Sequence, residues 1–188
     1  MTGGRRRPQW LRDVQRVDEA VYAAVASTPT PALDAGMRRL SGAADGSKLW
    51  MGAAAAMCTL QGARGRRAAV MGLSSVAVTS AVVNGLVKPL ARRRRPDRVR
   101  HGVPLDRHVE MPTTRSFPSG HAASAFAFAG GAGHVLPMAS VPLHLMATAV
   151  TYSRVHVGVH FPGDTVLGAV LGTAGSQLIT HAIDRRRR

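Results

Sequence analysis

The chain has 188 residues, with 25 Lys and Arg against 10 Asp and Glu, and its formal net charge at pH 7 is +15. This length suits a single domain. Hydrophobic residues make up 45% of the chain, which excludes disorder of the whole because so much apolar surface needs burial. Cys58 has no second cysteine to pair with, which excludes a disulfide scaffold.

The apolar residues are gathered into long blocks that contain no Asp, Glu, Lys or Arg. These blocks cover residues 68–87, 117–153 and 165–183. Arginine-rich stretches separate them, at residues 64–67, 92–100 and 185–188. A soluble helical bundle would instead spread its charges along one face of every helix. The pattern predicts an all-α integral membrane bundle that crosses the cell membrane several times.

The first part of the chain predicts an amphipathic helix and no signal peptide, because charges interrupt the place of an apolar signal segment. Val14, Val17, Val21 and Val25 recur at helical spacing within residues 14–40. We expect this segment, broken at two prolines, to lie on the membrane surface. The alternative is a peripheral helix packed on the bundle.

Five crossings are predicted after it. Residues 49–63 form the shortest, below a ~30 Å hydrocarbon core at about 1.5 Å per residue. The second covers residues 68–87. Glycines and prolines divide 117–153 into two spans joined by a tight hairpin around 134–142, and 165–183 form the last. With the N-terminal segment this makes six helices.

Three regions follow from this reading. They are a basic tail with an interfacial helix (1–46), a transmembrane domain (47–184) and a basic C-terminal tail (185–188).

Polar side chains are concentrated where the predicted spans begin or end. Three clusters occur there: Lys88 with Arg95 and Pro96; Pro118, Ser119, Gly120 and His121; and Ser153, Arg154, His160 and Asp164. Since successive spans alternate in direction, all three clusters must lie on the same side of the membrane. Connectivity alone therefore predicts one polar site.

The residue types in this site suit a phosphate group. Lys88, Arg95 and Arg154 supply positive charge, and arginine can hold two phosphate oxygens at once. Ser119 and Gly120 stand at a helix start, where free N–H groups and the helix dipole favour an anion.

The histidines of the site suit acid–base or nucleophilic chemistry. His160 and His121 are the groups in the set that act as nucleophile, base or acid near neutral pH. Asp164 follows His160 by four residues, about one helical turn, so its carboxylate can orient the imidazole.

The order and spacing of these clusters resemble the three-part signature of the type 2 phosphatidic acid phosphatase (PAP2) superfamily. The matching residues are Lys88-x6-Arg95-Pro96, Pro118-Ser119-Gly120-His121 and Ser153-Arg154-x5-His160-x3-Asp164. No signature position departs from the pattern, and the flanking spans fit the same six-helix layout.

The resemblance implies a role for each residue. His160 would be the nucleophile that forms a phosphohistidine, Asp164 would orient it, and His121 would protonate the leaving alcohol. The phosphate would be held by Lys88, Arg95, Ser119, Gly120 and Arg154. Such enzymes need no metal and no other cofactor.

Other polar residues receive simpler interpretations. We expect Arg92, Arg93 and Arg94 to form a basic cluster that sets topology or contacts anionic lipid. The acidic residues of the following loop would balance its charge. They are Asp97, Asp106 and Glu110. The remaining membrane histidines are expected at helix ends and in hydrogen bonds between helices. They are His134, His144, His156 and His181.

Two other functions compete with a lipid phosphatase. A vanadium-dependent haloperoxidase would use the same anion site, but those relatives are generally larger and soluble. A basic protein that binds nucleic acid or anionic lipid would explain the charge of +15, but its arginines would not gather at the ends of spans. We expect a lipid phosphate substrate and membrane lipids as partners, and no nucleic acid.

The sequence leaves the substrate and the orientation open. Phosphatidic acid, phosphatidylglycerol phosphate and polyprenyl mono- or diphosphates all place a phosphate at headgroup level. If the N-terminal segment does not cross, 18 basic residues lie on the catalytic side against 7 opposite, which places the site in the cytoplasm. If it crosses, the numbers are 13 and 12 and the rule gives no orientation.

Overall fold

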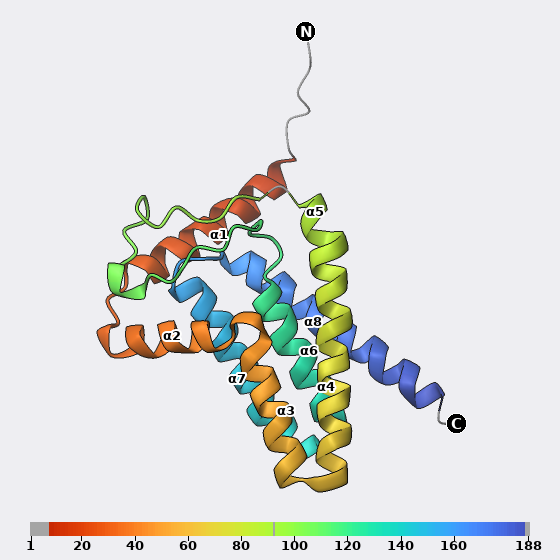
Figure 1. The fold of residues 1–188 in the computed structure, drawn as a ribbon. Helices are drawn as coiled ribbons and strands as arrows, with labels where there is room; N and C mark the ends of the chain where they lie inside the picture. The colour runs from red at the N-terminus through yellow and green to blue at the C-terminus, as the bar shows by residue number, and fades with distance from the viewer. Residues whose placement is uncertain (1–7, 92, 187–188) are drawn as a thin grey trace.

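The computed structural model describes residues 8–91 and 93–186, and within this part of the chain it contains helices and no strand (Figure 1). The helices are α1 (Gln9–Ser27), α2 (Pro31–Ala43), α3 (Lys48–Leu60), α4 (Gly62–Val82), α5 (Lys88–Leu90), α6 (Gly120–Val135), α7 (Pro137–His156) and α8 (Pro162–Arg185). A π-helical turn, η2 (Val83–Val87), joins α4 to α5 without a break, and short 3-10 turns η1 (Asp45–Ser47) and η3 (Leu105–Arg107) lie in the links. The all-helical prediction is confirmed.

Helix α6 forms the centre of the bundle, where it packs against α4, α7 and α8. Small residues allow this close packing. A Cβ atom at Gly72 of α4 would lie 2.9 Å from the ring of Phe128, and one at Gly172 of α8 would lie 2.3 Å from the carbonyl oxygen of Ala123. The glycines therefore bring α4 and α8 against the helix that carries Gly120 and His121.

By length and composition, two of the described helices can cross a membrane: Gly62–Leu90 and Pro162–Arg185. Helices α3 and α6 have 13 and 16 residues. At about 1.5 Å per residue they extend roughly 20 and 24 Å, less than a ~30 Å hydrocarbon core. Helix α6 packs between the longer helices α4, α7 and α8, and α3 packs against α4.

The layout differs from the prediction in its details. The N-terminal amphipathic segment breaks at the prolines as expected, and the break makes two separate helices, α1 and α2, the second starting at Pro31. The described chain therefore has seven helices when α4, η2 and α5 count as one. The hairpin is tighter than predicted, since only Leu136 separates α6 from α7 and Pro142 lies inside α7. Helix α4 also begins earlier and includes the arginines of 64–67.

Helix α1 lies across one end of the bundle, where α7 ends and α8 begins (Figure 1). Its inner face is attached to the link between them: the Tyr22 hydroxyl donates to the Gly158 carbonyl at 3.3 Å, and the Gly163 N–H donates to Asp18 at 2.6 Å. Its other face exposes an apolar stripe. The stripe contains Trp10, Val14, Val17 and Val21.

The same link depends on a glycine. Gly158 has φ +73°, a conformation that side chains disfavour, and a Cβ there would lie 2.9 Å from the Tyr22 hydroxyl. Its left-handed turn ends α7, and the N–H groups of Val159 and His160 then return to the Arg154 carbonyl at 3.1 and 3.2 Å. This turn directs His160 back toward the bundle.

Candidate active site

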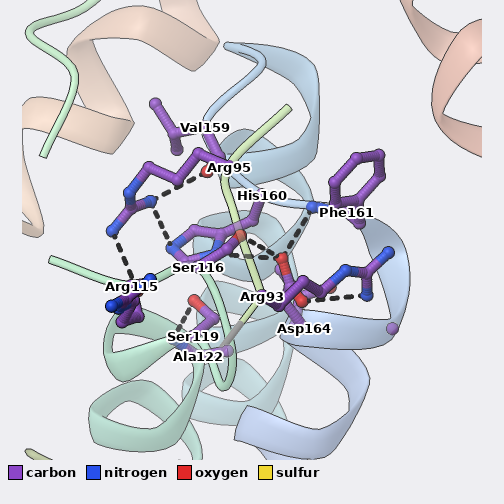
Figure 2. A network of polar contacts seen from close by, with 12 residues as sticks. Arg93, Arg95, Arg115, Ser116, Ser119, Ala122, Val159, His160, Phe161 and Asp164 are labelled. Atoms are coloured by element: carbon purple, nitrogen blue, oxygen red, sulfur yellow. Dashed lines mark hydrogen bonds and ion pairs between the residues drawn. The ribbon is translucent and has the colours of Figure 1, made fainter. Parts of the chain in front are cut away.

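His160 lies between a carboxylate and a guanidinium group (Figure 2). Its Nδ1 is 3.4 Å from Asp164 Oδ2, and its Nε2 is 3.2 Å from Nη1 of Arg95. The side chain is 2% exposed. Since a carboxylate only accepts hydrogen bonds, this geometry assigns the proton of a neutral imidazole to Nδ1. The lone pair of Nε2 then faces the cationic side of the site.

Asp164 is held more tightly than the histidine that it contacts. It is fully buried, and its Oδ2 accepts hydrogen bonds from the Ser116 hydroxyl at 2.5 Å and from the Phe161 N–H at 3.0 Å. Arg93 donates to Oδ1 at 3.0 Å. A buried carboxylate with this many donors stays ionised and cannot rotate.

Arg93 is therefore part of the site, and the interpretation of it as a basic surface cluster is wrong. It bridges Asp164 and Asp18 of α1, and its guanidinium lies 4.2 Å from the centre of the Phe161 ring. The sequence could not distinguish Arg93 from its neighbours because it belongs to a run of four arginines. Arg94 is exposed as expected, and Arg92 lies outside the described residues.

The three predicted phosphate-binding cations lie near one another. Arg95 and Arg154 are both close enough to Lys88 to repel its charge. Arg95 is oriented by hydrogen bonds to the carbonyl groups of Val159 at 2.8 Å and Thr114 at 2.9 Å. Burial lowers the pKa of Arg95 below its usual value, and the nearby Arg98 adds to this. The charges gather although they repel one another, which favours binding of an anion.

Arg154 carries an unsatisfied donor. Its side chain is 1% exposed, and its Nη1 donates to the hydroxyl and the carbonyl group of Ser41. Its Nε is buried and has no hydrogen-bond partner among the described residues. A buried N–H without an acceptor destabilises a protein by about 1–3 kcal/mol. An anion that accepted a hydrogen bond from this N–H would remove that cost, which favours anion binding here.

The start of α6 faces the same cations. The Ser119 hydroxyl caps the helix by accepting from the Ala122 N–H at 3.4 Å, as expected for this residue type. A side chain at Gly120 would lie 3.4 Å from the Lys88 ammonium nitrogen. Glycine at this position therefore leaves room beside the lysine at the positive end of the helix.

His121 belongs to the same group of residues and has its own carboxylate partner. Its Nε2 is 2.7 Å from Oδ1 of Asp45, which belongs to the η1 turn between α2 and α3. The His121 side chain is 23% exposed, so it is accessible from the surface of the site.

Burial lowers the pKa of His160 to about 4, and the charges of Arg95 and Arg154 add to this effect. The hydrogen bond and the negative charge of Asp164 oppose it. The imidazole is therefore neutral at pH 7, which is the form that has a lone pair for nucleophilic attack.

The structure brings together all eight residues that the sequence selected for this site. It adds three that the sequence did not indicate: Arg93, Ser116 and Asp45. Ser116 is close to Ser119 in the sequence, but a serine in a loop has no pattern that distinguishes it. Asp45 is distant from the signature along the chain, so only folding places it beside His121.

The other histidines form contacts away from this centre. His134 lies 3.0 Å from Asp184 at the far end of α6, and His144 contacts the Ser140 carbonyl within α7. His156 contacts Asp34 of α2 at 2.9 Å, which is a contact between helices. In the described part of the chain, no three His, Cys, Asp or Glu side chains gather in a way that could hold a metal ion.

The end of the helical bundle thus holds a buried histidine, a carboxylate and a group of cations, an arrangement that suits a phosphate. The sequence model of the PAP2 superfamily matches residues 69–188, and the chain belongs to this superfamily.

Named relatives agree with the assignment. The chain is 32% identical over 161 residues to a decaprenylphosphoryl-5-phosphoribose phosphatase of Mycolicibacterium smegmatis, with 84% of each chain covered. It is 35% identical over 107 residues to the phosphatase of the same name in Mycobacterium tuberculosis, with 55% of each chain covered. The latter match spans about half the length of that relative.

A solved structure shares the fold. The transmembrane PAP2-type phosphatidylglycerolphosphate phosphatase of Bacillus subtilis superposes with a TM-score of 0.69 at 26% identity. The superposition covers 92% of this chain and 87% of that one. The likeness to a transmembrane enzyme confirms the prediction of an integral membrane bundle.

Proposed function

We propose that this protein is a membrane phosphatase that hydrolyses a lipid phosphate monoester or diphosphate through a phosphohistidine. The observation that carries the proposal is the position of His160, with Nδ1 toward Asp164 and Nε2 toward Arg95. A proton held on Nδ1 leaves Nε2 free to attack phosphorus.

The proposed reaction has two steps. In the first, His160 Nε2 forms a bond to phosphorus, the bond between phosphorus and the leaving oxygen breaks, and His121 donates a proton to that oxygen. In the second, water gives a proton to His121 and its oxygen bonds to phosphorus, while the bond between phosphorus and His160 Nε2 breaks and its electron pair returns to the imidazole. Inorganic phosphate is released, and both histidines regain their starting forms. Lys88, Arg95 and Arg154 stabilise the negative charge in both steps, so no metal is required.

The position of the site at the helix ends favours a lipid substrate. The phosphate of a lipid can reach the start of α6 while its apolar tail remains beside the bundle. Decaprenylphosphoryl-5-phosphoribose is in the names of two relatives, so polyprenyl-linked sugar phosphates join phosphatidic acid, phosphatidylglycerol phosphate and polyprenyl phosphates as candidates.

We also propose a multi-pass protein of the cell membrane whose site faces the cytoplasm. Helix α1 contacts the active-site link through Asp18 and Tyr22 near its middle, which supports a helix that lies on the site face and does not cross. Under this arrangement 18 basic residues lie on the catalytic side against 7 opposite. Positive residues concentrate on the cytoplasmic side of membrane proteins.

Cysteine labelling in intact cells tests this orientation. Leu105 is suitable for substitution because it lies in the loop before α6 and is 81% exposed, whereas Arg107 in the same turn is fully buried. In a Cys58→Ser background, Leu105→Cys should resist a membrane-impermeant maleimide until the cells are opened. Labelling of intact cells would place the site outside.

Phosphate release by the purified protein in detergent tests the activity. The substrates are phosphatidic acid, phosphatidylglycerol phosphate, decaprenylphosphoryl-5-phosphoribose and polyprenyl mono- and diphosphates, all with EDTA present. We expect turnover of at least one substrate, inhibition by orthovanadate, and loss of turnover in His160→Ala. Folded protein that releases no phosphate from any of them would contradict the proposal.

A further inference from the structure

The carboxylate of Asp45 contacts two of the residues assigned to phosphate chemistry. Its Oδ1 lies 2.7 Å from Nε2 of His121 and 3.5 Å from Nη1 of Arg154. The shorter distance makes His121 its principal partner. The Asp45 side chain is 53% exposed, so packing in the protein interior does not explain its position.

The turn that carries Asp45 is held by hydrogen bonds on its α2 side and has a defined backbone conformation on its α3 side. Arg154 donates to the Ser41 hydroxyl and carbonyl at the end of α2, just before the turn. Gly46 and Ser47, directly after Asp45, both have φ +60°, and this conformation is uncommon for serine. Local strain of this kind persists where the surrounding structure requires it. The link between α2 and α3 thus presents Asp45 to His121 in a defined position.

The contact with Asp45 determines which ring nitrogen of His121 can donate a proton to the substrate. A protonated imidazole has two N–H groups, and a carboxylate beside it favours the protonated form. With Nε2–H donated to Asp45, the N–H on Nδ1 is the one left for the leaving oxygen.

We infer that Asp45 is a positioning residue for leaving-group protonation, and this inference rests on the proposed phosphatase function. When the bond between phosphorus and oxygen breaks, its electron pair stays on the leaving oxygen, and the Nδ1 proton of His121 moves to that oxygen. Asp45 touches neither atom. It acts through His121 by fixing the ring and stabilising its charged form.

The chain contains a matched pair without this function. His134 and Asp184 lie 3.0 Å apart at the opposite end of α6, and both side chains are nearly half exposed. The pair has the same chemical groups but lies far from the cations and from His160. Asp184→Asn therefore controls for the loss of one exposed ion pair.

The test compares two substrates that differ in their need for a proton. Dodecyl phosphate releases an alkoxide, which must be protonated, whereas a nitrophenyl phosphate with the same dodecyl chain releases a stable phenolate. We expect Asp45→Asn to lower kcat on dodecyl phosphate by about 10- to 100-fold and on the nitrophenyl ester by less than about threefold. Asp184→Asn should change neither, and Asp45→Asn should add nothing to His121→Ala on dodecyl phosphate.

Each other outcome overturns the inference. Equal losses on the two substrates would show a structural role, and faster turnover of both would show that Asp45 obstructs the phosphate site. An effect of Asp45→Asn that persists in His121→Ala would show that it acts elsewhere. If the wild-type protein hydrolysed neither these esters nor any of the lipid phosphates named above, the proposed phosphatase function itself would fail. A thermal unfolding midpoint shared by the wild type and the variants distinguishes these cases from misfolding.

Discussion

The two histidines of the site stand in opposite surroundings. His160 is 2% exposed and faces a carboxylate that is fully buried and accepts hydrogen bonds from Ser116, Phe161 and Arg93. His121 is 23% exposed and faces Asp45, which is 53% exposed and belongs to a turn between helices. The same pair of residue types is thus used once in the interior and once at the surface.

The difference corresponds to two chemical tasks. A nucleophile needs one fixed tautomer and a neutral ring, and burial together with a fixed carboxylate supplies both. A residue that protonates a leaving group needs a charged form, which the carboxylate of Asp45 favours, and contact with varied substrates, which a partly exposed ring allows. If this comparison is right, substitutions in the buried pair of His160 and Asp164 should reduce turnover more than substitutions in the exposed pair of His121 and Asp45.

Loss of the proposed nucleophile should have the largest effect. We expect His160→Ala to reduce kcat by about 10⁴-fold or more, because no neighbouring group can replace its lone pair. Single-turnover assays with ³²P-labelled lipid should also show no acid-labile phosphoprotein. Folded variant protein that kept a measurable fraction of wild-type turnover would assign the nucleophile to another residue.

Loss of the orienting charge should come next. In Asp164→Asn the amide can donate to Nδ1, which moves the imidazole proton to Nε2 and removes the attacking lone pair. We expect kcat to fall by about 10³-fold with a smaller change in KM. A similar loss in Asp45→Asn on every substrate would remove the distinction between the two pairs.

Burial of the neutral ring should also make stability depend on pH. The pKa of His160 is lowered from 6.5 to about 4 in the folded protein, so between these values the unfolded chain binds more protons. Stability should therefore fall as the pH decreases from 7 toward 4, with a loss of roughly 2 kcal/mol at pH 5 from this residue. Thermal unfolding in detergent at pH 7 and pH 5 measures it.

The control for this pH effect is another histidine. His160→Gln should reduce the difference between the two pH values, whereas His181→Gln, at an exposed position on α8, should keep the wild-type difference. Equal behaviour of the two variants would show that His160 is not the buried neutral group.

Loss of Arg93 should have the smallest effect of the series. Asp164 keeps its hydrogen bonds from Ser116 and Phe161 in Arg93→Gln, so we expect only about a tenfold decrease in kcat. Arg94→Gln, at the exposed position next to it, should leave kinetics unchanged. Identical kinetics for both variants would return Arg93 to the role of a surface charge.

The sequence alone determined the membrane class, the convergence of three polar clusters and the eight candidate site residues. The physical reason is that uncharged blocks of about 20 residues and alternating spans are properties of the chain order itself. Lys88, Gly120 and His160 could be placed on one face without knowledge of any side-chain contact.

The tertiary structure decided what could not be seen in that order. Arg93 and Arg94 are adjacent in the sequence, but Arg93 is half-buried and Arg94 is exposed. The carboxylates that Arg93 contacts, Asp18 and Asp164, are 75 and 71 residues away from it in the chain. Asp45 acquires its contact with His121 across 76 residues. Such pairs arise from the packing of α1 and of the link between α2 and α3 over the site, and no local pattern of residues encodes that packing.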